Sequence, residues 1–98
     1  MSTRFELADF KPLIGQAFQI RYPDHSDTLT LLEAEAARIQ LAGFPPAFSL
    51  LFEGEDRRVM LGQHIYALEN AVLGRIELAL IPVQPGSNGA FRYEAVFN

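Results

Sequence analysis

Turn-forming residues recur at short intervals along this chain, and most of the segments between them alternate apolar and polar side chains. This period of two is typical of strands with one buried face, because successive strand side chains point to opposite sides of the sheet. The segments expected to be strands are 16–22, 28–41, 48–53, 59–68, 76–83 and 91–98. The pattern predicts a mainly β fold, namely a small antiparallel β-barrel or sandwich of about six strands.

Length and composition are consistent with one compact domain over residues 1–98. The chain has 98 residues, of which 49% are hydrophobic. Disordered chains combine low hydrophobicity with a strong charge imbalance, so this composition argues for a folded domain. Runs of turn-forming residues separate the later strands, and Pro85–Gly89 is the strongest turn signal among them. We expect the last two strands to form an antiparallel hairpin across it.

The first segment has a helical pattern. Its apolar residues fall on one helical face and are Leu7, Phe10, Leu13 and Ile14. Because Pro12 is tolerated only in a first turn, the helix is expected to begin near Asp9, and Gly15 is suited to end it. We expect one or two turns that pack as a lid on the end of the β core.

The segment Thr28–Leu41 is compatible with either a helix or a strand. Its Ala, Glu, Arg and Gln residues favour a helix, and Thr30 and Glu33 could form a capping box. The strand interpretation requires a bulge near Leu31–Leu32. Beyond such a bulge, Glu33 and Glu35 would face solvent, and three residues would face inward: Leu32, Ala34 and Ala36.

Charge and cysteine content argue against several classes of partner. The net charge is −4, and the densest basic site, Arg57–Arg58, follows acidic residues at 53, 55 and 56. Nucleic acids and anionic membranes attract a basic surface, so neither is expected as a partner. The absence of cysteine excludes disulfides and thiolate metal sites. The N-terminus lacks the apolar run of a signal peptide, and we expect a cytoplasmic protein.

Candidate sites for metal binding and catalysis are sparse. Asp24, His25 and Asp27 could ligate a metal, but together with Pro23 and Ser26 they are typical of a turn, and the interpretation of Pro23–Asp27 as a turn is preferred. His64 could act as a general base, yet no second catalytic group can be placed beside it. We therefore predict no catalytic, metal-binding or cofactor-binding residues, and a protein that is not an enzyme.

Two further groups of residues have a structural and a functional interpretation. Glu33 and Glu35 would lie on the same face of a strand. They could act as paired catalytic carboxylates, but an acidic face exposed to solvent is the preferred interpretation. The aromatic residues could line a ligand cavity or fill the core, and the core is preferred in a domain this small. They are Phe18, Tyr22, Phe48, Phe52, Phe91, Tyr93 and Phe97.

The order of segments in the second half resembles a family of short uncharacterised bacterial β domains. The residues that carry the resemblance are Phe48–Gly54, Leu61–Asn70, Leu73–Gly74, Leu78–Val83 and the ending Tyr93–Asn98, which reads Tyr-Glu-Ala-Val-Phe-Asn. The resemblance implies a stand-alone β domain, and it favours a strand over Thr28–Leu41. Some members are encoded near phage-tail-like or tail-collar proteins, which implies assembly rather than catalysis.

We therefore expect a non-enzymatic protein-interaction or assembly module that binds a protein partner or associates with itself. This hypothesis depends on the missing site chemistry, the acidic surface and a sheet with at least one open edge. The alternative is a small carrier that binds an apolar or aromatic ligand inside the barrel, behind Phe48, Phe52 and Tyr93. The final strand is expected to be part of the core, so deletion of the last six residues should unfold the domain.

Overall fold

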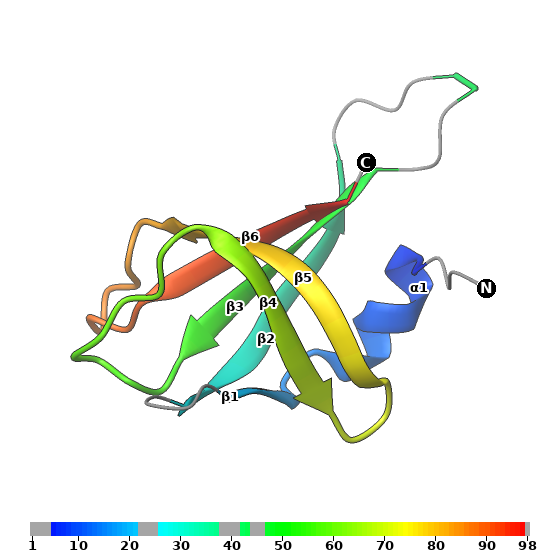
Figure 1. The fold of residues 1–98 in the computed structure, drawn as a ribbon. Coiled ribbons are helices and arrows are strands. Elements are labelled where there is room, and N and C mark those ends of the chain that lie inside the picture. The colour runs from blue at the N-terminus through cyan, green and yellow to red at the C-terminus, as the bar shows by residue number, and fades with distance from the viewer. Residues whose placement is uncertain (1–4, 22–25, 38–41, 44–46, 98) are drawn as a thin grey trace.

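Six antiparallel strands close into a barrel in a computed structural model that describes residues 5–21, 26–37, 42–43 and 47–97 (Figure 1). The strands are β1 (Ala17–Arg21), β2 (Ser26–Ala36), β3 (Phe48–Gly54), β4 (His64–Asn70), β5 (Gly74–Val83) and β6 (Arg92–Phe97). Their order around the barrel is β1-β2-β3-β6-β5-β4. The mainly β prediction is confirmed, and of the two expected forms the structure adopts the barrel.

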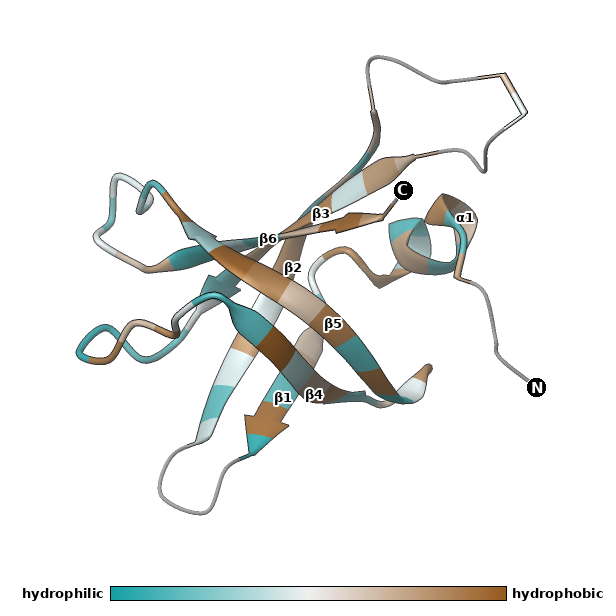
Figure 2. Cartoon of the chain, turned by 45° about the horizontal axis from the view of Figure 1, so that its top comes forward, coloured by the Kyte–Doolittle hydropathy of each residue, from teal (hydrophilic) through white to brown (hydrophobic). Residues whose placement is uncertain are grey.

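The alternation of side chains explains why these segments form strands around one core. In β3, Phe48, Leu50 and Phe52 are buried, and the residues between them are partly exposed. Bands of hydrophilic and hydrophobic residues alternate in the same way along β1 and β5 (Figure 2). The largest fully buried side chains come from every strand and from the N-terminal helix, and they are Tyr93, Phe10, Phe18, Phe52, Ile20, Leu29, Leu31, Leu50, Leu68 and Leu80.

The barrel closes through two short ladders. β1 pairs with β4 at two positions, and β5 pairs with β6 at three. At the first of these seams the side-chain amide of Asn70 also donates a hydrogen bond to the carbonyl oxygen of Ala17, at 3.0 Å. The prediction of an open sheet edge is wrong for the described strands. Closure depends on pairing between strands that can lie far apart in the chain, such as β1 and β4. A local sequence pattern does not show which distant strands pair.

The ambiguous segment is a strand with a bulge. In β2 the register against β3 shifts between Leu31 and Glu33, as the strand interpretation requires. Glu33 and Glu35 are exposed and Ala34 is buried, in agreement with the prediction. The inward placement of the other two is wrong: Leu32 is only partly buried because it is the extra residue of the bulge, and Ala36 is exposed where the strand ends. Residues 38–41 lie outside the described residues.

The N-terminal helix packs as the expected lid, at the end of the barrel where β2 and β6 finish (Figure 1). It consists of α1 (Leu7–Phe10) and a 3-10 turn (Lys11–Leu13). It begins two residues before the predicted Asp9, and the Asp9 carboxylate accepts a hydrogen bond from the Glu6 N–H at 2.8 Å. Ile14 is 47% exposed, because the chain leaves the helical path before Gly15 at φ +91°; its predicted burial is wrong.

Several strand boundaries differ from those expected. Ser26 and Asp27 were placed in a turn but begin β2, where they pair with Arg21 and Ile20; residues 22–25 lie outside the described residues. The expected strand 59–68 starts only at His64 and continues to Asn70. β5 buries one face along most of its length, and Pro82 and Val83 at its end are partly buried.

Candidate functional site

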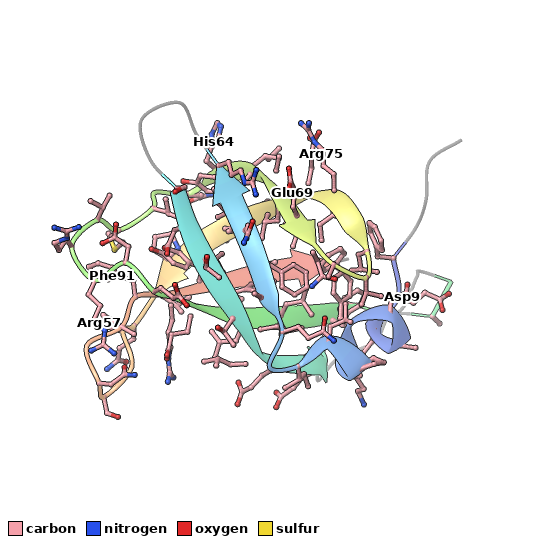
Figure 3. The ribbon with its side chains drawn as sticks, turned by 90° about the horizontal axis from the view of Figure 1, so that it is seen from below. Asp9, Arg57, His64, Glu69, Arg75 and Phe91 are labelled. Atoms are coloured by element: carbon pink, nitrogen blue, oxygen red, sulfur yellow. The ribbon has the colours of Figure 1, made fainter. Side chains whose placement is uncertain are left out.

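Two loops meet at the end of the barrel opposite α1 (Figure 1). They are the β3–β4 loop (residues 55–63) and the β5–β6 loop (residues 84–91). Figure 3 shows Arg57 and Phe91 together at this end and Asp9 at the other. We call this region the loop end.

The β3–β4 loop is attached to β2 by the carboxylate of Asp27 and by one backbone hydrogen bond. Asp27 is 7% exposed, and its Oδ1 accepts hydrogen bonds from three backbone N–H groups: Thr28 at 2.8 Å, Asp56 at 3.0 Å and Glu55 at 3.2 Å. The Glu55 N–H also lies 3.0 Å from the carbonyl oxygen of Thr28. A charged acceptor strengthens such bonds, so Asp27 holds the first residues of the loop firmly against the barrel.

Gly54 leaves the space that this carboxylate occupies. The Oδ2 atom of Asp27 is buried and has no hydrogen-bond partner among the described residues. A Cβ atom at position 54 would lie 2.8 Å from that oxygen. With a side chain at position 54, either Asp27 or the end of β3 would have to move. The loop attachment therefore depends on a glycine in the last position of β3.

Further hydrogen bonds hold the middle and the end of the loop. The Oδ1 atom of Asp56 accepts from the N–H groups of Arg58 at 2.8 Å and Val59 at 3.3 Å. The N–H of Leu61 donates to the hydroxyl oxygen of Tyr93 at 3.0 Å, inside the barrel mouth. Five backbone N–H groups of the loop are thus bound by Asp27, Asp56 and Tyr93.

Two tyrosine hydroxyls lie at the foot of the loop. Burial raises the pKa of Tyr93, the hydrogen bond from Leu61 lowers it in part, and the negative charges of Asp27 and Asp56 raise it further. Burial also raises the pKa of Tyr66, whose hydroxyl donates to the carbonyl oxygen of Gly62 at 2.6 Å. Both groups stay neutral near pH 7 and act as hydrogen-bonding groups that fix the end of the loop.

Between these attachments the loop presents four consecutive exposed side chains. Arg57 and Arg58 are exposed, Val59 is 47% exposed and Met60 is 53% exposed. One guanidinium nitrogen of Arg57 donates to the carbonyl oxygen of Asn88 at 2.6 Å, which connects this loop to the β5–β6 loop. The backbone is therefore held in place while the side chains face solvent.

A recess of about 750 Å³ opens beside the loop. Its lining residues come from the β1–β2 hairpin and the β3–β4 loop, and are Gln19, Ile20, Arg21, Ser26, Asp27, Thr28, Glu55, Asp56, Arg57 and Arg58. Three arginines are among them, and none of the three forms an ion pair within the described part of the chain. The recess is polar and charged, unlike the apolar interior of the barrel.

The residues proposed from the sequence as metal ligands or catalytic groups do not form a cluster among the described residues. Asp24 and His25 lie outside them, Asp27 binds backbone N–H groups, and Ser26 lines the recess. No group of three or more potential ligands in the described ranges could hold a metal ion. His64 is exposed at the start of β4, where its ring meets Tyr66 edge-on at 5.4 Å (Figure 3).

The aromatic residues proposed as a cavity lining pack against one another instead. Phe48 stacks on Phe97 with ring centroids 4.4 Å apart, and Phe18 meets Phe52 edge-on at 5.2 Å. Tyr93 is fully buried. Tyr22 lies outside the described residues, and Phe91 packs at the edge of the core. The core interpretation is confirmed for the described members of this set.

The protein is thus a small closed antiparallel β-barrel with one lid helix, and a recess lined in part by three arginines lies at its loop end. The chain belongs to a family described as a domain of unknown function, DUF6916, whose model matches residues 5–97. No curated protein and no solved structure matches the chain. The expected membership of an uncharacterised domain family is confirmed, whereas bacterial origin and a phage-tail association stay predictions. Among the described residues, no helix is both long and apolar enough to cross a membrane.

Proposed function

We propose that this domain is a non-enzymatic protein-interaction module and that the β3–β4 loop is its recognition element. One observation carries the proposal: five backbone N–H groups of the loop are bound by buried or partly buried acceptors, yet the loop exposes Val59 and Met60. The fold holds this segment in a defined shape without burying its apolar side chains.

Such a loop is suited to binding for two physical reasons. Methionine and arginine are enriched at protein interfaces, and Arg57, Arg58 and Met60 lie within four consecutive exposed residues of the loop. A loop already held in one conformation loses little entropy when a partner binds. The hydrogen bonds to Asp27, Asp56 and Tyr93 therefore favour tight contact with a partner protein or a second copy of the chain.

The same groups provide the argument against catalysis. The carboxylates of Asp27 and Asp56 accept backbone N–H groups, and the hydroxyl of Tyr93 accepts the N–H of Leu61. A general base needs a free acceptor within reach of substrate. These side chains are engaged in holding the loop, so their arrangement supports a binding role over an enzymatic one.

The carrier hypothesis receives less support. A carrier needs an internal cavity behind Phe48, Phe52 and Tyr93, and these side chains are 3%, 0% and 0% exposed within the core cluster. The recess lies at the loop end and has a charged lining. Assembly onto a larger structure in the cytoplasm, such as a phage-tail-like particle, is the form of the interaction role that the resemblance favours.

Site-specific photo-crosslinking tests the proposal. A benzoylphenylalanine is placed at position 60 in the full chain, and in a matched control at position 72. Val72 is 65% exposed, in the turn between β4 and β5 at the other end of the barrel. Irradiation in the cells that naturally make the protein should give a discrete covalent adduct from position 60 and none from position 72. No adduct from position 60, or equal adducts from both, would overturn the proposal.

A further inference from the structure

Three arginines line the recess, and within the described residues their guanidinium groups retain unused hydrogen-bond donors. Arg57 uses one donor on the carbonyl oxygen of Asn88, and Arg21 uses one on the side-chain oxygen of Gln19 at 3.0 Å. The side chain of Arg58 has no hydrogen bond or ion pair within the described residues. Each guanidinium carries five N–H donors, so most of these donors have no partner among the described residues.

Within the described residues, no acidic residue of the recess forms an ion pair with these arginines. Asp27 and Asp56 turn their Oδ1 atoms toward backbone N–H groups, three on Asp27 and two on Asp56. Oδ2 of Asp27 is buried beside Gly54. As far as the described residues go, the guanidinium groups thus stay available to an anion from outside the chain, although the net charge is −4.

We infer that the recess binds a carboxylate side chain of an acidic peptide segment, carried by the partner of the interaction role proposed above, on which this inference rests. The planar guanidinium fork matches a carboxylate and binds it through two parallel hydrogen bonds. Val59 and Met60 follow Arg58 directly in the loop, so a peptide with apolar residues beside its acidic ones would meet both kinds of contact.

The charges at the recess select a carboxylate over a phosphate. Asp27, Glu55 and Asp56 are part of the lining and offset much of the charge of the three arginines, whereas the cost of removing an anion from water rises steeply with its charge. A carboxylate brings one negative charge, whereas a phosphate monoester brings nearly two at pH 7. A single carboxylate shared between two arginines is therefore favoured, and binding should weaken as salt screens the exposed charges.

The test uses the full 15N-labelled domain and three end-capped peptides of alternating leucine and a second residue. That residue is glutamate in the probe, glutamine in the neutral control and phosphoserine in the phosphate control. The glutamate peptide should shift the amide signals of residues 55–61 and bind more tightly than both controls. The doubly substituted variant Arg57→Gln, Arg58→Gln should raise the dissociation constant about tenfold, which corresponds to about 1.4 kcal/mol. Arg75→Gln, on the exposed face of β5 (Figure 3), should leave it unchanged.

Three outcomes would overturn the inference. The glutamate peptide could leave residues 55–61 unshifted, the phosphoserine peptide could bind more tightly, or Arg75→Gln could weaken binding as much as the double substitution. Signals of β-strand amides remote from the loop report whether each variant is folded. A crosslinked adduct from position 60 together with unshifted loop signals would mean that the interaction role stands and the carboxylate assignment fails. If neither a crosslinked adduct nor a shift of the loop signals were seen, both the interaction role and the carboxylate assignment would be contradicted.

Discussion

The buried carboxylate oxygen of Asp27 occupies the position beside Gly54 where any other residue would carry its Cβ. The separation would be 2.8 Å, shorter than van der Waals contact. Both residues face the interior from neighbouring strands, Asp27 from β2 and Gly54 from β3. Because the other oxygen of Asp27 holds Glu55 and Asp56, this one contact connects the end of β3 to the shape of the β3–β4 loop.

Substitution of Gly54 tests this relationship. Gly54→Ala should lower the free energy of unfolding by about 1–3 kcal/mol, the usual cost of overpacking, because the Asp27 carboxylate must move. The control is Gly62→Ala, since a Cβ there meets nothing within 4 Å and its φ is not in the left-handed region. Urea denaturation of both variants makes the comparison. Equal stability of the two would contradict the close contact.

The raised pKa values of Tyr93 and Tyr66 predict a loss of stability in alkali. The neutral phenol is favoured in the folded state, and an unfolded tyrosine titrates near pH 10. This contribution is therefore complete below about pH 10 and is lost as the pH rises through the folded pKa. Denaturation between about pH 8 and 11 should show the difference between the unmodified protein and Tyr93→Phe shrinking as pH increases. A constant difference would mean that the pKa of Tyr93 is not raised.

The lid helix should contribute strongly to the stability of the fold through the ring of Phe10. Phe10 is fully buried and contacts Phe5, Phe48 and Phe97, with ring centroids 5.5–5.9 Å apart. Phe10→Ala should cost about 3–5 kcal/mol in thermal or urea unfolding. Ile14→Ala, at a position that is 47% exposed in the same segment, should change stability by less than about 0.5 kcal/mol. Similar effects of the two would show that the helix is not packed as a lid.

Removal of the last six residues should prevent folding. Residues 93–98 include the buried Tyr93 and Ala95 and most of β6, which pairs with both β3 and β5. Their loss would break the barrel at both ladders, and a domain with about 5–15 kcal/mol of stability cannot tolerate this. The truncated chain should show no cooperative thermal transition. A melting temperature equal to that of the full chain would mean that β6 is dispensable.

The strands could be predicted from the sequence because burial on one face leaves a local signature. Phe48, Leu50 and Phe52 alternate, and their strand was expected within one residue of its observed end. The bulge in β2 was predicted because two adjacent leucines interrupt an otherwise regular alternation. Local patterns of this kind do not record which distant strands pair, so closure of β1 on β4 was missed.

The loop end was missed for a related reason. Asp27 is a frequent turn residue and was assigned to a turn, although it continues the inward alternation of Leu29 and Leu31. Gly54 likewise follows Leu50 and Phe52 on the inner face of β3. An inward aspartate and an inward glycine at the same end of two strands are a signal that could have identified the site. Only the pairing of β2 with β3 shows that the two residues meet.

Amide hydrogen exchange of the free domain tests most directly whether the β3–β4 loop is a preformed recognition element. The N–H groups of Glu55, Asp56, Arg58, Val59 and Leu61 should be protected although the loop faces solvent. In Asp27→Asn, protection should fall mainly at Asp56, since its acceptor loses its charge, whereas the Glu55 N–H keeps its hydrogen bond to the carbonyl oxygen of Thr28. If all five exchanged in the unmodified protein at the rates of an unstructured peptide, the loop would not be held in one conformation, and the central claim would be contradicted.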